Sequence, residues 1–540
     1  MLTESYPIAV VPGMSRLFLD YCAGAPAVRR FYASPPIGSG AGSGCDWQTR
    51  PPLPAHWTEL AGLLRAQNSS AAAAAALEAL DEGAGTVVTG QQVALFGGPL
   101  FTPFKAATAV ARAREATAAG RPHAAIFWLA TEDHDFAEIA QVTFPAHKEL
   151  RTLKYEKAPT VPRPVGGVVL DESIVPLIEQ AWELLGPSEA MDALAEAYQP
   201  GRTFAQAFAD FYAKVFAAQG LLVLDAGSRA FHRIGAPVLR AAIERADELH
   251  QALIERNREL EAAGYHAQVA VGAQSSLLFL IDEGTGARLA LKRTTPTAAE
   301  PKGLWLAGRQ SLSTAELVGI LEAEPERISP SALLRPVFQD FLLSTSTTVG
   351  GPAEIAYFAQ SAVLFERILG RGTPALPRFS ATLIEPGAGE LLRRHELTLE
   401  QVWSKNAASL AQLLAARSLP AKGREELAAA GTALDGELEP LLAWMRSMDE
   451  GLGRSAVTAA SKMRYQMNRL RRLAANFQLQ SDASLGREAE AISRALYPGG
   501  VLQERLHGAA YCLARYGFEL AEQITAQAAS CGAGHTALWL

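Results

Sequence analysis

The sequence predicts an α/β protein whose core is a parallel β-sheet with helices on both faces. Short runs of apolar residues recur along the chain, and most of them lead into a helical pattern. Strands buried on both faces give such continuous runs, and strand–helix alternation is typical of parallel sheets. Each run also ends in glycine or polar residues. Because ligands of open parallel sheets bind beyond the carboxyl ends of the strands, a site is expected among these residues.

Five apolar runs are expected to form the sheet. In chain order they span residues 86–88, 124–129, 221–224, 344–349 and 376–384. The first leads into TGQQ, the second into ATEDHD and the fourth into GGP. The core that carries them is assigned to residues 1–145, 201–265 and 326–389.

Two stretches interrupt the alternation, and we predict that both are insertions into the core. Residues 146–200 are rich in proline and then helical. Residues 266–325 contain turn residues between four short strand-like segments, which are 268–271, 277–281, 288–292 and 304–306. A Gly/Ser-rich connector is expected at residues 38–44.

Residues 390–497 are rich in Leu, Ala, Glu and Arg and have almost no strand signal. Apolar residues alternate there in steps of four and three, the heptad spacing of a coiled coil. They are Leu434, Leu438, Leu441, Met445, Met448 and Leu452, then Met463, Met467, Leu470, Ala474 and Phe477. We predict a helical hairpin with coiled-coil packing, in which Pro440 kinks or starts a helix.

Residues 498–540 begin with Pro-Gly-Gly, which ends the arm. An amphipathic helix that packs on the core is expected to follow. Its apolar side would carry Leu502, Leu506, Leu513, Leu520 and Ile524.

The bulk composition excludes several classes of protein. A chain of 540 residues that are 49% hydrophobic is expected to form more than one domain and is not disordered. The net charge of −7 gives no general attraction to nucleic acid or anionic lipid. No apolar segment is long enough to cross a bilayer, and no secretory signal is evident. The cysteines form no CxxC pair, which favours a reducing cytoplasm; they are Cys22, Cys45, Cys512 and Cys531.

The first polar cluster combines glycines with a lysine at the start of a helix. Gln91 and Gln92 follow the first strand, and Gly98, Pro99 and Lys105 come soon after. Glycine allows a close approach of the backbone, and a helix N-terminus attracts anions. An ordinary strand–helix turn explains the same residues equally well.

The same arrangement recurs after the fourth strand, where Gly351 precedes Pro352 and Glu354. Two such junctions on one sheet are expected to form opposite walls of a crevice that holds carboxylates or phosphates. The chain has neither a Walker A pattern nor GxGxxG, so a standard nucleotide loop is not supported.

The second cluster is acidic and follows the second strand. Glu132, Asp133, His134 and Asp135 are consecutive. A histidine between carboxylates is a reasonable proton acceptor, so Asp133, His134 and Asp135 are the predicted catalytic residues, with Glu132 binding substrate. A divalent metal is the alternative, but consecutive residues rarely all face one ion, and no metal site is predicted.

The third group is basic. Arg335 and Arg378 lie beside predicted strands, and arginine binds carboxylates in a bidentate manner. Either arginine could instead be a structural partner of Glu385 or Glu354. Arg378 is the one assigned to substrate binding.

Several of these segments belong to longer strings, which are TGQQVALFGGPLFTPFK (89–105), FWLATEDHDFAEI (127–139), ISPSALLRPVFQD (328–340), VGGPAEIAYFAQ (349–360), PRFSATLIEP (377–386) and YPGGVLQER (497–505). Together and in this order they resemble the bacillithiol-biosynthesis cysteine-adding enzyme family. The Gly/Ser connector and Thr131, where small residues are usual, are local departures from the family pattern.

The resemblance implies a Rossmann-like core with two connecting insertions and a helical coiled-coil arm, often as a homodimer. It implies a cysteine ligase that adds L-cysteine to the amine of glucosaminyl malate in the last step of bacillithiol synthesis. It also implies that an adenine nucleotide, such as ATP, binds near the core–arm junction, where Arg505 lies.

A mechanism follows as a hypothesis. The carboxyl group of cysteine is activated as an acyl-phosphate or adenylate, and the acidic turn deprotonates the attacking amine. Lys105 or Arg378 holds a malate carboxylate. The alternatives are a nucleotidyl- or glycosyl-transferase on the same fold and a non-catalytic coiled-coil dimer scaffold.

Overall fold

The computed structural model describes residues 2–33, 52–294, 303–530 and 532–540. The predicted connector at residues 38–44 lies outside these ranges, as do Cys45 and Cys531. The chain forms two compact units. The core unit comprises residues 5–381 and 504–536, and the arm unit comprises residues 1–4, 382–503 and 537–540.

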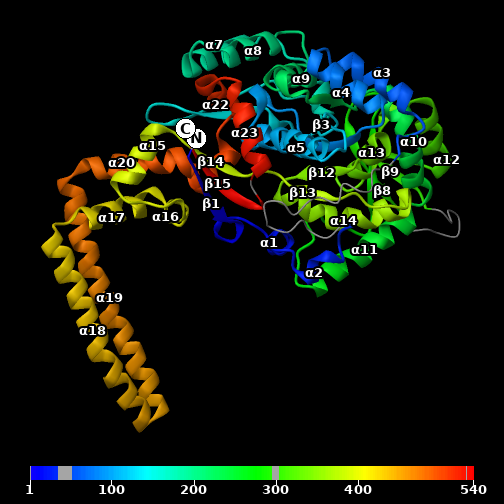
Figure 1. The fold of residues 1–540 in the computed structure, drawn as a ribbon. Helices are drawn as coiled ribbons and strands as arrows, with labels where there is room; N and C mark the ends of the chain where they lie inside the picture. The colour runs from blue at the N-terminus through cyan, green and yellow to red at the C-terminus, as the bar shows by residue number, and fades with distance from the viewer. Residues whose placement is uncertain (1, 34–51, 295–302, 531) are drawn as a thin grey trace. The chain divides into compact units, whose positions relative to one another are not determined.

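A five-stranded parallel sheet lies at the centre of the core unit (Figure 1). Its strands, in spatial order, are β13 (Ala375–Pro377), β12 (Thr347–Gly350), β2 (Gly85–Gln91), β3 (His123–Leu129) and β6 (Leu222–Asp225). In the register, Val87 pairs with both Thr347 and Ala125. Every residue of β2 is buried, as expected for a strand covered on both faces. The predicted parallel α/β fold is therefore confirmed.

Helices surround this sheet (Figure 1). Those of the core unit that precede the second insertion are α1 (Arg16–Cys22), α2 (Pro26–Arg29), α3 (Trp57–Gln67), α4 (Ala71–Asp81), α5 (Phe101–Ala118), α6 (Phe136–Ile139), α7 (Ile174–Leu185), α8 (Glu189–Ala197), α9 (Phe204–Val215), α10 (Arg229–Glu244) and α11 (Ala246–Ala262). After the insertion come α13 (Arg335–Leu343) and α14 (Pro352–Leu369).

The two faces of the sheet bury alternate residues of β3. Phe127 packs on Phe208 and Tyr212 of α9, with ring centroids 6.0 and 5.3 Å away. Trp128 packs instead on Phe338 of α13 at 6.2 Å. Because successive side chains of a strand point to opposite faces, α9 and α13 cover opposite faces of the sheet.

The fifth predicted strand, 376–384, is wrong as one element. The chain leaves the parallel sheet after Pro377 and resumes as β14 (Ala381–Ile384), which pairs in a three-stranded sheet of order β1 (Leu2–Pro7), β15 (Gly534–Trp539) and β14. Between the two strands, the buried side chains of Arg378 and Ser380 both bond Glu504. These bonds lie where the extended strand is interrupted between β13 and β14.

The first insertion is partly different from its prediction. A hairpin of β4 (Gln141–Pro145) and β5 (Leu150–Lys154) precedes α7 and α8. The sequence suggested only a proline-rich and then helical segment, and so missed the hairpin.

The second insertion is an antiparallel sheet in the order β10 (Gln310–Leu312), β9 (Trp305–Ala307), β8 (Arg288–Arg293), β7 (Ser275–Ile281) and β11 (Ile328–Pro330), with α12 (Thr314–Ala323) beside it. Its β-rich character is confirmed. The predicted strand at 268–271 is wrong, because Val269 bonds through its N–H and C=O to the side-chain amide of Gln360. Those bonds replace a strand ladder.

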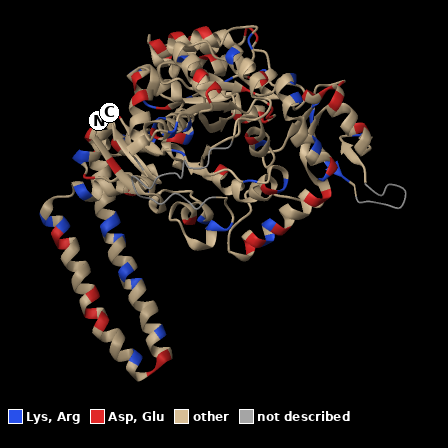
Figure 2. Cartoon of the chain, turned by 45° about the vertical axis from the view of Figure 1, so that its right-hand side comes forward, with Lys and Arg blue, Asp and Glu red and all other residues tan. Residues whose placement is uncertain are grey.

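The arm unit is helical. Its elements are α15 (Pro386–Arg394), α16 (Leu399–Trp403), α17 (Ala407–Ser418), α18 (Ala421–Met448), α19 (Glu450–Ser481) and α20 (Ala483–Leu496). The two long helices, α18 and α19, form a hairpin (Figure 1). Acidic residues gather on one of them and basic residues on the other (Figure 2), and Arg464 of α19 pairs with Asp435 of α18 at 2.7 Å.

The hairpin confirms the coiled coil and part of the predicted seam. Leu438 of the predicted seam is buried with Leu442 against Ala460 of α19, and Leu434 packs beside them. Leu441 and Met448 are instead 45% and 59% exposed, so this part of the predicted seam is wrong. Pro440 lies inside α18 and does not start a helix.

The predicted C-terminal helix is three short ones, α21 (Gln503–Leu506), α22 (Ala509–Tyr516) and α23 (Glu519–Ser530). Gly517 adopts a left-handed conformation, φ +70°, which separates α22 from α23. The helix α23 packs on α5, and Arg114 pairs with Glu522 at 2.6 Å. The predicted packing on the core is therefore confirmed for this helix. Among the described residues, no helix is both long enough and apolar enough to span a membrane.

Candidate active site

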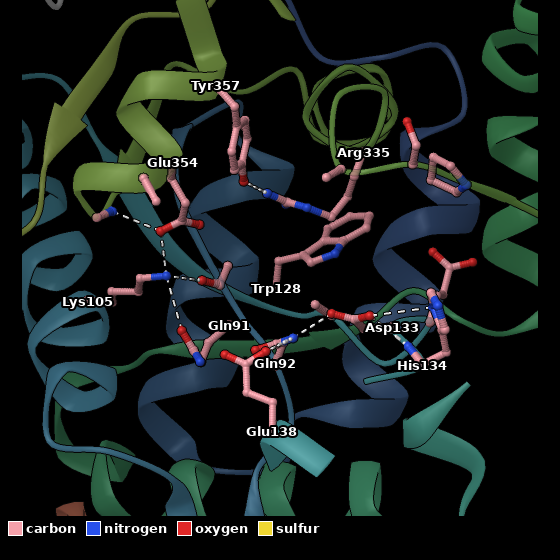
Figure 3. A pocket seen from close by; sticks show the side chains of 18 of the residues that line it. Gln91, Gln92, Lys105, Trp128, Asp133, His134, Glu138, Arg335, Glu354 and Tyr357 are labelled. Carbon is pink, nitrogen blue, oxygen red and sulfur yellow. Dashed lines mark hydrogen bonds and ion pairs between the residues drawn. The ribbon is translucent and has the colours of Figure 1, made fainter. Parts of the chain in front are cut away.

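A cavity of about 520 Å³ lies at the carboxyl ends of β2, β3 and β12 in the core unit (Figure 3). Side chains that follow all three strands line it, which is where ligands of open parallel sheets bind. It contains most of the predicted site residues, namely Gln91, Gln92, Lys105, Glu132, Asp133, His134, Gly351, Glu354, Arg378 and Arg505. Gly98, Pro99 and Asp135 are not part of its lining.

Lys105 of α5 joins the turns that follow β2 and β12. Its Nζ donates to Gly90 O at 2.9 Å and Gln91 Oε1 at 3.1 Å, and pairs with Glu354 Oε2 at 2.5 Å. Burial lowers the pKa of Lys105, although Glu354 opposes this shift. An ammonium group has three donors, and all three are used. Lys105 therefore fixes the wall of the cavity and has no donor left for a malate carboxylate, contrary to the hypothesis from the sequence.

Glu354 also accepts from the backbone N–H of Gly351 at 2.8 Å. This bond satisfies one of the N–H groups at the start of α14. The helix tip at Gly351 and Pro352 therefore lines the cavity as predicted, with Glu354 as part of its structure.

Arg378 forms a bidentate ion pair with Glu504. Its Nη2 donates to Oε1 at 2.6 Å and its Nη1 to Oε2 at 3.0 Å, with both side chains buried. Burial raises the pKa of Glu504, but Arg378, His535 and the N–H of Ala381 together lower it, and the net shift of the pKa is downward. The partner of Arg378 is therefore Glu504 rather than Glu385 or Glu354, and the guanidinium is largely occupied within the protein.

The acidic turn after β3 is organised by its own hydrogen bonds. Asp133 accepts from the backbone N–H of His134 at 2.7 Å and from the side chain of Gln92 at 2.5 Å. Asp135 accepts from the N–H of Glu138 at 3.2 Å and so caps α6. The structure places Asp133 and His134 in the cavity and turns Asp135 toward this cap.

Glu132 forms an ion pair with a buried histidine that the sequence did not suggest. Its Oε1 is 2.8 Å from His232 Nε2. The other ring nitrogen, Nδ1, lies 2.9 Å from Ile328 O and 3.1 Å from Pro325 O. Burial lowers the pKa of His232, but Glu132 and these carbonyl groups raise it more, so the net shift is upward. One Glu132 oxygen is thus occupied by a structural partner.

Arg288 is a cavity residue that the sequence analysis missed. It comes from β8 of the second insertion, and its Nη1 is 3.0 Å from His134 Nδ1. Its other donors bond Ser329 Oγ and Pro330 O, each at 3.0 Å. The guanidinium carbon lies 3.7 Å from the ring centroid of Phe279. The sequence pattern of one β-strand does not show which of its arginines contacts a turn that is distant in the sequence.

Arg335 was considered from the sequence and set aside, but it lines the cavity. Its Nη2 donates to the hydroxyl of Tyr357 at 2.8 Å and its Nη1 to Gln339 at 3.0 Å. Burial raises the pKa of Tyr357 to about 12, so both partners are neutral at ordinary pH. Tyr357 lies one helical turn after Glu354 on α14, and this spacing could have revealed it.

Arg288, Arg335 and Arg505 share one property. Within the described part of the chain, none of them forms an ion pair with a carboxylate. Arg505 is exposed and its side chain makes no hydrogen bond to any described residue. The cavity therefore holds three cationic side chains that no described carboxylate neutralises through an ion pair.

The turn at Gly98 and Pro99 was predicted to bind substrate, but it is not part of the lining of the cavity. Gly98 O accepts from Ala509 N at 2.8 Å, and Pro99 forms a β-bridge with Gly508. Gly98 has φ +69°, which favours glycine. The Phe-Gly-Gly-Pro segment thus holds the start of α22, and only the second Gly-Gly-Pro junction lines the cavity.

No group of three or more His, Cys, Asp or Glu side chains that could hold a metal occurs among residues 2–33, 52–294, 303–530 and 532–540. The cavity instead offers arginines, a buried lysine and an acidic turn. This combination suits an anionic ligand with an amine better than a metal ion.

The chain combines a Rossmann-like core, which has a cavity at its strand ends, with a coiled-coil arm. These features define the class as an α/β enzyme with a helical arm. The chain belongs to the BshC family of bacillithiol biosynthesis. The family's N-terminal Rossmann-like domain matches residues 1–379, and its C-terminal coiled-coil domain matches residues 381–540.

Relatives match over nearly the whole chain. A protein of Koribacter versatilis named "Putative cysteine ligase BshC" is 41% identical over 98% of this chain and 98% of its own length. Proteins with the same name from Solibacter usitatus and Salinibacter ruber are 34% and 30% identical, covering 95% and 94% of this chain and 95% and 93% of their own lengths.

Proposed function

We propose that this protein is a cysteine ligase that forms an amide between L-cysteine and the amine of glucosaminyl malate, the last step of bacillithiol synthesis. Family membership along the whole chain and the names of its relatives support this function. The observation that carries it at the site is the cavity itself, in which arginines without carboxylate partners face the same space as an acidic turn.

The substrate chemistry suits these groups. Glucosaminyl malate carries malate carboxylates and one amine, and arginine binds carboxylates through paired N–H donors. Arg335 is the proposed carboxylate ligand, because the donors of Lys105 and Arg378 are engaged by Glu354, Glu504 and backbone oxygens. The amine is proposed to lie beside Asp133.

Amide formation from a free carboxylate needs activation. ATP, when bound, would supply it by converting the cysteine carboxylate into an acyl-phosphate with release of ADP, or an acyl-adenylate with release of pyrophosphate. Arg505, with its free donors, suits the phosphate groups. The ammonium of the second substrate loses a proton to Asp133, and the amine nitrogen attacks the acyl carbon. Phosphate or AMP then leaves and takes the second proton of the nitrogen.

A homodimer through the arm is the proposed assembly. Several heptad side chains stay exposed on the α18–α19 hairpin, namely Leu441, Met448, Leu452, Met463, Leu470 and Phe477. A second copy would cover such a stripe. A cytoplasmic location is also proposed, since the proposed product is itself a thiol and Cys22 is a free cysteine.

The test is a direct assay of the full chain. Purified protein is incubated with glucosaminyl malate, cysteine and ATP, and the condensed thiol is measured by mass spectrometry together with ADP, AMP and pyrophosphate. Asp133→Asn is expected to abolish product, while Arg229→Gln, which changes an exposed pair with Glu326, serves as the matched control. No product from the wild type, or turnover of a nucleotide sugar without cysteine, would refute the proposal and favour a transferase.

A further inference from the structure

His134 has two ring nitrogens in different surroundings. Its Nδ1 is 3.0 Å from Arg288 Nη1 and 3.7 Å from Asp133 Oδ1. Its Nε2 makes no hydrogen bond to any residue that the structure describes, while the ring lines the cavity. The charged groups placed at the ring are thus Arg288 and Asp133.

The contact with Arg288 decides which nitrogen carries the proton. A guanidinium has N–H donors and no acceptor. Nδ1 must therefore offer its lone pair, and the proton of the neutral ring must sit on Nε2. In the opposite tautomer, two N–H groups would face each other at 3.0 Å.

Arg288 is held firmly enough to impose this choice. Its remaining donors bond Ser329 Oγ and Pro330 O, and its plane lies on Phe279 at 3.7 Å. Phe279 also contacts His134, with ring centroids 5.5 Å apart. The second insertion therefore presents a fixed cation to the turn after β3.

We propose that Arg288 is a positioning residue that keeps His134 as the neutral Nε2–H tautomer, so that His134 donates a hydrogen bond into the cavity and does not act as a base. This role rests on the proposed ligase function. The acceptor of the hydrogen bond from Nε2–H is then the acyl oxygen of the activated cysteine. As the amine nitrogen forms its bond to the acyl carbon, the C=O electron pair moves to this oxygen, and Nε2–H stabilises the charge. Asp133 takes one proton from the ammonium before the attack. When phosphate or AMP departs, the pair returns to C=O, and the leaving phosphate group takes the second proton of the nitrogen.

The first experiment needs no substrate and so is independent of the ligase function. Histidine is labelled with ¹⁵N in the full chain, the His134 signals are identified by their loss in His134→Gln, and spectra are recorded at pH 8. The expected result is a protonated Nε2 and an unprotonated Nδ1. Arg288→Met should populate both tautomers, whereas Arg293→Met on the same strand should leave the His134 signals unchanged.

A proton on Nδ1 in the wild type, or identical His134 signals in Arg288→Met, would overturn the positioning role. Both outcomes are distinct from a failure of the ligase assay, because they are read without turnover.

The second experiment separates a donor from a base. The glutamine amide can donate a hydrogen bond from a position close to Nε2 but cannot accept a proton at neutral pH. His134→Gln is therefore expected to keep at least a tenfold higher kcat than His134→Ala, which should lose about 10²-fold or more. Equal losses in the two variants would overturn the donor role.

Discussion

Replacing Glu504 by glutamine is expected to destabilise the core unit by about 3–5 kcal/mol, the usual cost of breaking a buried ion pair by removing one partner. The side chains of Arg378 and Glu504 are only 4% and 1% exposed. Arginine cannot lose its proton in a protein, so Glu504→Gln leaves a buried cation without its counter-charge.

The hydrogen bonds give the same magnitude. Glutamine keeps one oxygen, and its –NH₂ group cannot accept. If this group takes the place of Oε2, then Arg378 Nη1 at 3.0 Å and Ala381 N at 3.1 Å both lose their acceptor. An unsatisfied buried donor costs about 1–3 kcal/mol, so two of them cost about 2–6 kcal/mol, which spans the estimate from the charge.

The assay is urea unfolding of the full chain, followed by tryptophan fluorescence. Glu522→Gln is the matched control, because its pair with Arg114 has the same 2.6 Å distance but side chains 45% and 52% exposed. Exposed pairs contribute about 0–1 kcal/mol. A double variant, Arg378→Met with Glu504→Leu, should be less destabilised than the sum of its single changes. A Glu504→Gln variant as stable as Glu522→Gln would refute the reasoning.

Three further outcomes are expected. Arg335→Gln should raise KM for glucosaminyl malate at least tenfold while kcat changes less than threefold, as measured by product mass spectrometry; an unchanged KM would exclude Arg335 as a carboxylate ligand. His232, paired with Glu132, has a raised pKa, so its stabilising effect is complete below about pH 6.5 and is lost as pH rises through the folded pKa. The difference in unfolding free energy between the wild type and His232→Gln should thus shrink between pH 6 and 9, and a constant difference would contradict the pairing. Leu441→Asp with Met448→Asp should convert the proposed dimer to a monomer in sedimentation velocity without loss of helical circular dichroism; a dimer that persists would place the interface elsewhere.

The sequence predicted those parts of the fold that depend on local pattern. Four of the five apolar runs are strands of the parallel sheet, because a strand buried on both faces is mostly apolar. The polar residues after these strands converge for a topological reason, since the carboxyl ends of parallel strands lie at one edge. This brought Gln91, Asp133 and Gly351 into one cavity.

Pairings between distant segments could not be predicted in this way. Arg378 meets Glu504, and Glu132 meets His232, only after the chain has folded. Lys105 looked like a free cation at a helix start, but its neighbours in space use all its donors. Local sequence shows which side chains are charged, whereas tertiary packing determines which charges remain available.

Errors of register have a similar origin. Leu434 and Leu438 of the predicted seam pack within the hairpin, yet the next buried residue of α18 is Leu442 rather than Leu441. Both positions carry leucine, so the sequence pattern alone could not distinguish them. The arm therefore carries two sets of apolar side chains. One set is buried between α18 and α19, and the other is exposed.

The pairing of β7 with β8 has a consequence for how this protein can vary. Ile281 lies opposite Arg288, so Arg288 emerges on the same side as Phe279, two positions before Ile281. Side chains alternate along a strand, and a slip of one residue would send Arg288 to the other side. A single residue inserted between Asp282 and Ala287 could shift this pairing, and Arg288 would then leave the cavity although the turn itself does not line it. A longer loop that preserves the pairing would be tolerated.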